Sequence, residues 1–153
     1  PVLVALVIIG LAVLLLTQTR FGLHIYAIGG NEETARLAGV PVNRIKLLTY
    51  GISGLLAALA GILLTARLYS AQPRIGVGLE LEAIASSVLG GVSLFGGVGN
   101  IPSAVIGALL IGELGNGMNM LRVESYQQEM IKGLVLVAAV TVDMYTKRLE
   151  RRG

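Results

Sequence analysis

Cysteine and tryptophan are absent from the 153 residues of this chain, and histidine occurs once. Without cysteine there is no disulfide framework, no thiol nucleophile and no cysteine-based zinc site. The run Gly51-Ile52-Ser53-Gly54 matches a short nucleophile motif of intramembrane serine proteases, but such a serine needs a histidine base within hydrogen-bond reach. The one histidine, His24, lies in a polar segment outside that apolar stretch. The sequence therefore argues against a protease.

Charged residues are also scarce. They make up 14% of the chain, whereas soluble domains carry about 25%. Hydrophobic residues make up 54% and the mean hydropathy is +0.78. The basic residues behind the net charge of +3 lie at segment ends and are not interleaved with aromatic residues, which argues against nucleic-acid binding. This composition predicts an all-α integral membrane protein.

The sequence contains no glycine loop of the kind that binds a nucleotide phosphate. Gly76-Val77-Gly78 and Gly97-Val98-Gly99 do not continue to the last glycine of a dinucleotide fingerprint, and no strand is expected before either. We therefore expect no cofactor in this chain. If ATP drives the protein, another chain must bind it.

Apolar stretches predict about five transmembrane helices, since a helix needs roughly 20 residues to cross a bilayer. The chain begins at Pro1, without methionine and already inside an apolar run, so we interpret it as a piece of a longer protein. The expected spans are 1–19, 47–66, 82–94, 103–121 and 130–146, with a polar segment at 20–46.

Small residues recur at every fourth position in two of these spans, which places them on one helix face and predicts close helix packing. They are Ser53, Ala57 and Gly61 in one span, and Ala104, Ala108 and Gly112 in another.

The region from Ala83 to Gly112 has no charged residue, yet it is too long for one upright span and too short for two. Glycines and one proline interrupt its middle, which predicts a short span, a glycine turn and a second span. Non-helical backbone at membrane depth persists only where protein or a wet cavity surrounds it, so we expect this region inside a bundle. The interrupting residues are Gly90, Gly91, Gly96, Gly97, Gly99 and Pro102.

Basic residues indicate the orientation, because they are in excess on the cytoplasmic side of membrane proteins. One group lies in the polar segment and a second at the C-terminus, and the four spans between them return the chain to the same side. We therefore expect both groups, and the C-terminus, in the cytoplasm. The groups are Arg20, Arg36, Arg44 and Lys46, and then Lys147, Arg148, Arg151 and Arg152.

Carboxylates occur within or beside the spans. An ionisable residue inside a span is a functional hypothesis by default, and Glu113 is one, unless it pairs with a residue outside this chain. Asp143 lies near the inner end of its span and could pair with Lys147 one turn later. Glu80 and Glu82 are weak candidates for metal or acid–base chemistry, or else carboxylates that the dipole favours at a helix start.

The polar segment contains the signals of a short helix, Glu32 to Ala38. Asn31 is a good N-cap residue, and the first turn carries acidic residues that the helix dipole favours. Gly39 stands where a glycine would end the helix. So short a helix is marginal alone, and we expect the small apolar set Ala35, Leu37 and Ala38 to pack it against something else.

Four runs along the chain resemble the C-terminal half of the membrane permease of ribose-type monosaccharide ABC importers. They are AIGGNEETARLAGVPVNRIKLLTY, ARLYSAQP, GLELEAIASSVLGGVSLFGG and NGMNMLRVESYQQEMIKG. The resemblance extends from about Arg20 to Asp143. The chain departs from the family at Val98, where Arg or Lys is common, and at Glu113, where an apolar or aromatic residue is usual.

The resemblance implies the second half of a ten-span permease in the bacterial inner membrane, a transport subunit and not an enzyme. It implies three protein partners: an ABC ATPase subunit that binds the ATP, a second permease, identical or different, and an extracytoplasmic sugar-binding protein. Membrane lipid surrounds it. The segment that matches the family's cytoplasmic coupling helix, which docks on the ATPase, comprises Asn31, Glu32, Glu33, Thr34, Ala35, Arg36, Leu37, Ala38 and Gly39.

Polar residues elsewhere are candidates for the sugar pathway or for contact with the binding protein. Asn116 and Asn119 could line the pathway or instead bridge helices. The other candidates are Ser70, Gln72, Arg74, Glu80, Glu82, Glu113, Gln127 and Gln128. Two alternatives to the importer remain open. One is an ion-coupled carrier with Glu113 as its coupling site, and the other is a membrane interaction subunit without a pathway.

Overall fold

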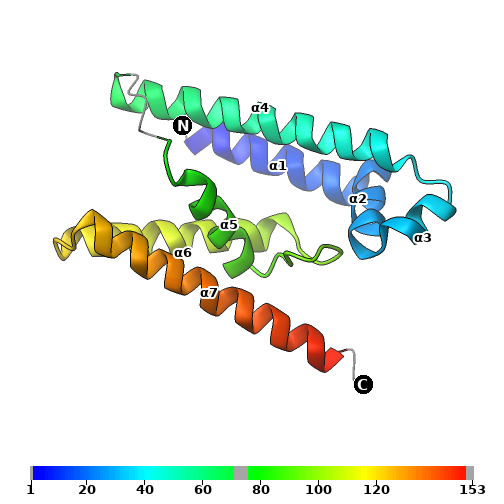
Figure 1. Cartoon of the computed structure of the whole chain (residues 1–153). Coiled ribbons are helices and arrows are strands. Elements are labelled where there is room, and N and C mark those ends of the chain that lie inside the picture. The colour runs from blue at the N-terminus through cyan, green and yellow to red at the C-terminus, as the bar shows by residue number, and fades with distance from the viewer. Residues whose placement is uncertain (1, 71–75, 151–153) are drawn as a thin grey trace. The chain divides into compact units, whose positions relative to one another are not determined.

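The computed structural model describes residues 2–70 and 76–150, and of residues 146–150 it describes the backbone alone. Seven helices and no strand occur in these described ranges (Figure 1). The helices are α1 (Val2–Gln18), α2 (Arg20–Gly30), α3 (Glu32–Leu37), α4 (Val42–Leu68), α5 (Leu79–Leu89), α6 (Ile101–Met120) and α7 (Ser125–Glu150). They form two compact units, Pro1–Val77 and Gly78–Gly153.

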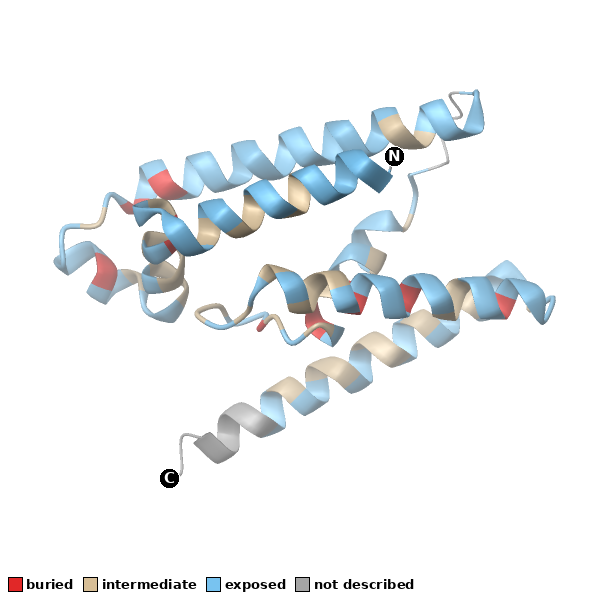
Figure 2. Cartoon of the chain, turned by 180° about the vertical axis from the view of Figure 1, so that it is seen from behind, coloured by how far each residue is buried: buried red, intermediate tan, exposed pale blue. Residues whose placement is uncertain are grey.

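Among the described residues, α4 and α6 are each long and apolar enough to cross a membrane. A third span is possible if α1 and α2, which meet at a bend of 73°, count as one. None of the apolar stretch of α4 is buried in this chain, and most of it is exposed (Figure 2), as expected for a surface that lipid or other helices cover. The all-α membrane class is thus supported, and the expected five spans are confirmed only in part.

The bend between α1 and α2 is built from one threonine and one glycine. Thr19 Oγ1 accepts a hydrogen bond from the Gly22 N–H at 3.4 Å and donates one to the Leu15 carbonyl at 2.5 Å. A Cβ atom at Gly22 would lie 1.9 Å from the Leu16 carbonyl oxygen, so only glycine permits this close turn. The α1 helix falls within the stretch 1–19 that was expected as a span, whereas α2 was not expected from the sequence.

In the first unit, the buried side chains gather where α2, α3 and the start of α4 meet. Ala35, Val42 and Ile45 are all buried there, and Figure 2 shows little burial along α1 and the rest of α4. The small residues Ser53, Ala57 and Gly61 on α4 are exposed, so the close packing expected of them stays a prediction.

In the second unit, α5 and α6 cross at close range through glycine. A Cβ atom at Gly107 would lie 2.0 Å from the Ser86 carbonyl oxygen, and one at Gly90 would lie 2.3 Å from the Ser103 carbonyl oxygen. Close approach of two backbones requires such small residues. Of the small residues expected in this contact, Ala104 lies at the crossing, whereas Ala108 and Gly112 are exposed. The packing face is therefore the one that carries Gly107.

The expected glycine turn separates α5 from α6. The α5 helix ends with the Val92 N–H donating to the Ser87 carbonyl at 3.0 Å and the Gly91 N–H donating to the Val88 carbonyl at 2.9 Å. These bonds form a Schellman cap, and Gly91 occupies its left-handed position at φ +83°. The α6 helix begins after Asn100, whose side chain accepts from the Ser103 N–H at 2.8 Å.

At 11 residues, α5 is too short to cross a membrane, so the expected span at 82–94 is instead a short helix followed by the turn. The expected spans at 103–121 and 130–146 fall on α6 and α7.

Candidate functional site

The candidate site is α3, and Asn31 joins it to α2. The Asn31 N–H donates to the Ala27 carbonyl at 3.1 Å and so caps the C-terminus of α2. The Asn31 side chain accepts a hydrogen bond from the Thr34 N–H at 3.0 Å and so caps the N-terminus of α3. The N-cap that the sequence predicts is confirmed, and this one residue sets the angle between the two helices.

The end of α3 also matches the sequence signal. The Val40 N–H donates to the Ala35 carbonyl and the Gly39 N–H to the Arg36 carbonyl, both at 3.0 Å. This is a Schellman cap, with Gly39 at φ +84°. The helix runs from Glu32 to Leu37 with Ala38 as its C-cap, one residue shorter than expected.

Packing holds one face of α3 against α2 and the first turns of α4. Ala35 is 5% exposed and faces the same small core as Val42 and Ile45. Leu37 is 85% exposed, and Ala38 is exposed as well. Of the three apolar residues expected to pack α3 against something else, Ala35 does so within this chain, because a helix this short turns only one of them toward the core. Packing of Leu37 and Ala38 stays a prediction.

An ion pair ties α3 to α4. The Glu32 carboxylate accepts a hydrogen bond from Lys46 Nζ at 2.6 Å and another from the Arg36 guanidinium at 3.3 Å. The Lys46 hydrogen bond is the main cause that lowers the pKa of Glu32, and the charges of Lys46 and Arg36 add to the effect. The residue pair Glu32–Lys46 was not expected from the sequence, since 14 positions separate its members.

The outward face of α3 presents a mixed surface. Leu37 projects from it beside the exposed side chains of Glu33, Thr34 and Arg36. A hollow of about 430 Å³ lies among Glu32, Glu33, Arg36 and Leu37. An exposed leucine flanked by opposite charges, on a helix fixed from behind, is chemically suited to contact another protein.

The candidate pathway residues are dispersed. Gln72 and Arg74 lie outside the described residues, and Ser70 is exposed just after α4. On α6, Glu113 and Asn116 are exposed, and neither side chain has a hydrogen bond or ion pair to another described residue. Glu80, in the first turn of α5, and Gln127, in α7, are exposed too.

Three pathway candidates, Asn119, Gln128 and Glu82, form contacts between elements of the second unit. The Gln128 side chain donates to Asn119 Oδ1 and to the Val123 carbonyl, both at 2.9 Å, and so joins the end of α6 to the start of α7. Glu82 forms an ion pair with Lys132 of α7. Asp143 accepts a hydrogen bond from Ser93 Oγ at 3.3 Å; its expected partner, Lys147, has a side chain outside the described residues.

The chain was compared with known proteins. Residues 2–140 match the family described as branched-chain amino acid transport system / permease component. The chain is 55% identical over 129 residues to a ribose import permease protein of Escherichia coli, covering 84% of this chain and 40% of that protein. It is 49% identical over 138 residues to the L-arabinose transport system permease protein of the same organism, covering 90% and 42%.

A xylose transport system permease protein of Haemophilus influenzae is 47% identical over 148 residues, covering 97% of this chain and 40% of that protein. No solved structure matches the chain. The chain thus spans about 40% of the length of these relatives. The family match extends through both units of the structure, and the resemblance drawn from the four runs is confirmed: this chain belongs to the permease family of the branched-chain amino acid transport system type.

Proposed function

We propose that this chain forms part of the membrane permease of an ATP-driven monosaccharide importer and that α3 is its docking element for a separate ATPase subunit. The observation that carries the proposal is the construction of α3. It is capped at both ends, anchored from behind by Ala35 and by the Glu32–Lys46 ion pair, and open on the side that bears Leu37.

A short helix held in this way can transmit a partner's movement to the helices it is attached to. Its caps, its buried face and its ion pair all connect it to α2 and α4, so a partner that moved α3 would move the long apolar helix α4 with it. Alternating access would follow if closure of an ATPase dimer tilted the helix bundle. In this mechanism the permease does no bond chemistry, and ATP is bound by its partner.

The relatives named above indicate the sugar class, because their names specify ribose, L-arabinose and xylose. We infer a monosaccharide substrate delivered by an extracytoplasmic binding protein, with a second permease completing the pathway. The chain would correspond to the C-terminal half of the full permease, in the bacterial inner membrane, with α3 and the C-terminus in the cytoplasm, as the basic residues favour.

The test uses the full-length permease, its ATPase and its binding protein in reconstituted vesicles. Leu37→Asp should abolish copurification of the ATPase and lower ATP-dependent sugar uptake at least about tenfold, since buried apolar anchors dominate protein interfaces. Leu121→Asp is the matched control, because Leu121 is 79% exposed and lies after α6, in the second unit. Undiminished uptake by Leu37→Asp would refute the docking role.

Charge changes on α3 must be chosen with the ion pairs in view. Glu33 is exposed and outside the pairs of Glu32, so Glu33→Arg tests the partner contact with those pairs intact. Arg36→Glu would also place a second carboxylate one turn from Glu32 and destabilise the helix itself. We expect Glu33→Arg to uncouple ATP hydrolysis from uptake while membrane insertion is unchanged.

The ion-coupled carrier is the second candidate, and Glu113 favours it because this carboxylate lies in α6, a helix able to span the membrane. Uptake that persisted without ATP and collapsed with the ion gradient would establish the carrier. Uptake that needs ATP, together with copurification of an ATPase, would establish the importer and exclude a subunit without a pathway.

A further inference from the structure

Two polar contacts connect the α5 region to α7. Glu82, in the first turn of α5, pairs with Lys132, and Ser93, in the glycine turn after α5, donates to Asp143. Both contacts join residues that are 50 positions apart. The two segments therefore run in the same direction between these points.

The spacing places both contacts on one face of α7. Lys132 and Asp143 are separated by 143 − 132 = 11 residues, which is about three helical turns and about 16 Å along the axis. The two side chains thus project in nearly the same direction from opposite ends of one stripe. Two contacts on the same face of α7 can hold the α5 region against α7 at both ends.

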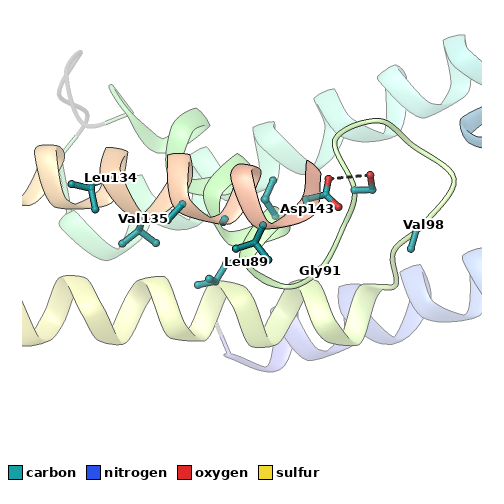
Figure 3. A pocket seen from close by; sticks show the side chains of 11 residues that line it. Leu89, Gly91, Val98, Leu134, Val135 and Asp143 are labelled. Carbon is teal, nitrogen blue, oxygen red and sulfur yellow. Dashed lines mark hydrogen bonds between the residues drawn. The ribbon is translucent and has the colours of Figure 1, made fainter. Parts of the chain in front are cut away.

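Between the two contacts lies an apolar groove. Its volume is about 660 Å³, and its lining includes Val88 and Leu89 of α5 with Leu134, Val135 and Ala138 of α7. Figure 3 shows these walls and, at one end, the hydrogen bond of Asp143. Apolar walls can slide against each other, whereas charged and hydrogen-bonded contacts require a particular geometry. The polar contacts at the two ends therefore fix the position of α5 along α7.

Ser93 links Asp143 to the backbone of the glycine turn. It is buried, at 8% exposed. Its Oγ accepts a hydrogen bond from the Phe95 N–H at 3.2 Å, and its own N–H donates to the Val98 carbonyl at 3.0 Å. A shift of Asp143 would therefore shift the backbone of the turn through Ser93.

We propose that the Glu82–Lys132 and Ser93–Asp143 contacts form a clamp that keeps α5, the glycine turn (residues 90–100) and α7 together as one rigid body throughout the transport cycle. Lys132 and Asp143 are then positioning residues that act through Glu82 and Ser93. The clamp suits an 11-residue helix that cannot cross a membrane alone and ends in non-helical backbone. Tests that measure sugar uptake rest on the proposed transport function.

This chain contains no cysteine, so the cross-linking test uses the full-length permease with any cysteine outside this chain replaced by serine. Glu82→Cys with Lys132→Cys removes one contact, and Ser93→Cys with Asp143→Cys removes the other. We expect low uptake from each double variant and recovery to within about twofold of the unmodified protein once a short bifunctional thiosulfonate joins the two thiols. Uptake that stays low after complete cross-linking would overturn the rigid clamp.

The yield of the cross-link gives a readout that does not depend on transport. A rigid clamp predicts equal yields with and without a nonhydrolysable ATP analogue bound to the assembled importer. Yields that differ severalfold between the two conditions would overturn the proposal, even where uptake is normal. If the unmodified permease shows no ATP-dependent uptake, the proposed function fails, and the clamp is then decided by the permease alone: each pair of thiols should cross-link in high yield, and low yields would overturn the clamp.

Charge exchange tests the first contact. Glu82→Lys places two cations together and should lower uptake at least about tenfold, or about 1.4 kcal/mol. Adding Lys132→Glu should restore uptake to within about twofold, which loss of a merely local contact would not explain. Glu129→Lys is the control, because Glu129 is exposed and one turn from Lys132. No rescue in the double variant would contradict the pairing role.

Conservative variants test the second contact. Asp143→Asn keeps an oxygen that can accept from Ser93 Oγ and should retain uptake, whereas Asp143→Leu should lower it severalfold. Ser93→Ala should match Asp143→Leu, and Ser87→Ala is its control, because the Ser87 hydroxyl bonds only within α5, to the Ala83 carbonyl. Equal uptake from Asp143→Asn and Asp143→Leu, both low, would show that charge and not the hydrogen bond is needed, and would overturn this arm of the clamp.

Discussion

The two short helices of this chain, α3 and α5, are held in place by contacts of very different range. The caps of α3 join residues no more than five positions apart, and its ion pair reaches 14 positions. The caps of α5 are equally local, but its attachments to α7 reach 50 positions, and its crossing of α6 brings Ser86 against Gly107.

This difference has a consequence for how each helix responds to change. A helix defined by local signals can lose one contact and keep its shape, because its caps remain. A helix positioned by distant partners depends on close packing, so the displacement caused by one added carbon atom spreads to the neighbouring helices. Substitutions should therefore be more damaging around α5 than around α3.

The largest effect is expected at the crossing of α5 and α6. Gly107→Ala would place a methyl group 2.0 Å from the Ser86 carbonyl oxygen, so the helices must separate, at a cost of about 1–3 kcal/mol or more. Thermal unfolding of the purified full-length permease measures this loss. Gly112→Ala, which meets nothing within 4 Å, is the control. Equal melting temperatures for the two variants would refute the close crossing.

A smaller effect is expected at the end of α3. Gly39→Ala meets no neighbouring atom, but the residue has φ +84°, so the cost is conformational and about 1 kcal/mol. Amide hydrogen exchange at Val40 and Gly39 should become faster, since their hydrogen bonds close the Schellman cap. Gly30→Ala, also without close neighbours and not at positive φ, should leave exchange unchanged. If both variants behaved alike, the cap would not depend on glycine.

The smallest effect is expected from the protonation of Glu32. Its pKa is lowered from the ordinary value of 4.5, chiefly by the Lys46 hydrogen bond. A carboxylate with a lowered folded-state pKa stabilises the fold above its unfolded pKa, and that contribution disappears as the pH falls through the folded value. The protection factors of the α3 amides, which are corrected for the intrinsic pH dependence of hydrogen exchange, should fall below pH 4.5, and Glu32→Gln should remove this pH dependence. The pair is solvent-exposed, so salt should weaken the effect.

Much of α3 could be predicted from the sequence because its determinants are neighbours along the chain. Asn31 and Gly39 carry the cap chemistry in their residue types, and the structure confirms both. The direction of Leu37 could not be predicted, because it depends on where α2 and α4 place the buried face. The α2 helix was missed because Arg20 and His24 marked its segment as polar, although most of its other residues are apolar.

The position of the glycine turn could be predicted from the sequence, but its hydrogen bonds and helix contacts could not. Its glycines mark a break in an uncharged stretch, and four of them adopt positive φ in residues 91–99. The contact face of α6 was predicted one position away from Gly107, because small residues every four positions occur on more than one face of a glycine-rich helix. Nothing local in the sequence indicates which face the partner helix will choose.

The sequence by itself determined the membrane class, the family and the cap residues of α3, since these follow from composition, from runs of residues and from hydrogen bonds between near neighbours. Only the tertiary structure decided that Leu37 is exposed, that Gly107 is the crossing point and that Lys132 and Asp143 meet the α5 region. The physical reason is that these contacts depend on the position and rotation of whole helices, which distant side chains set together.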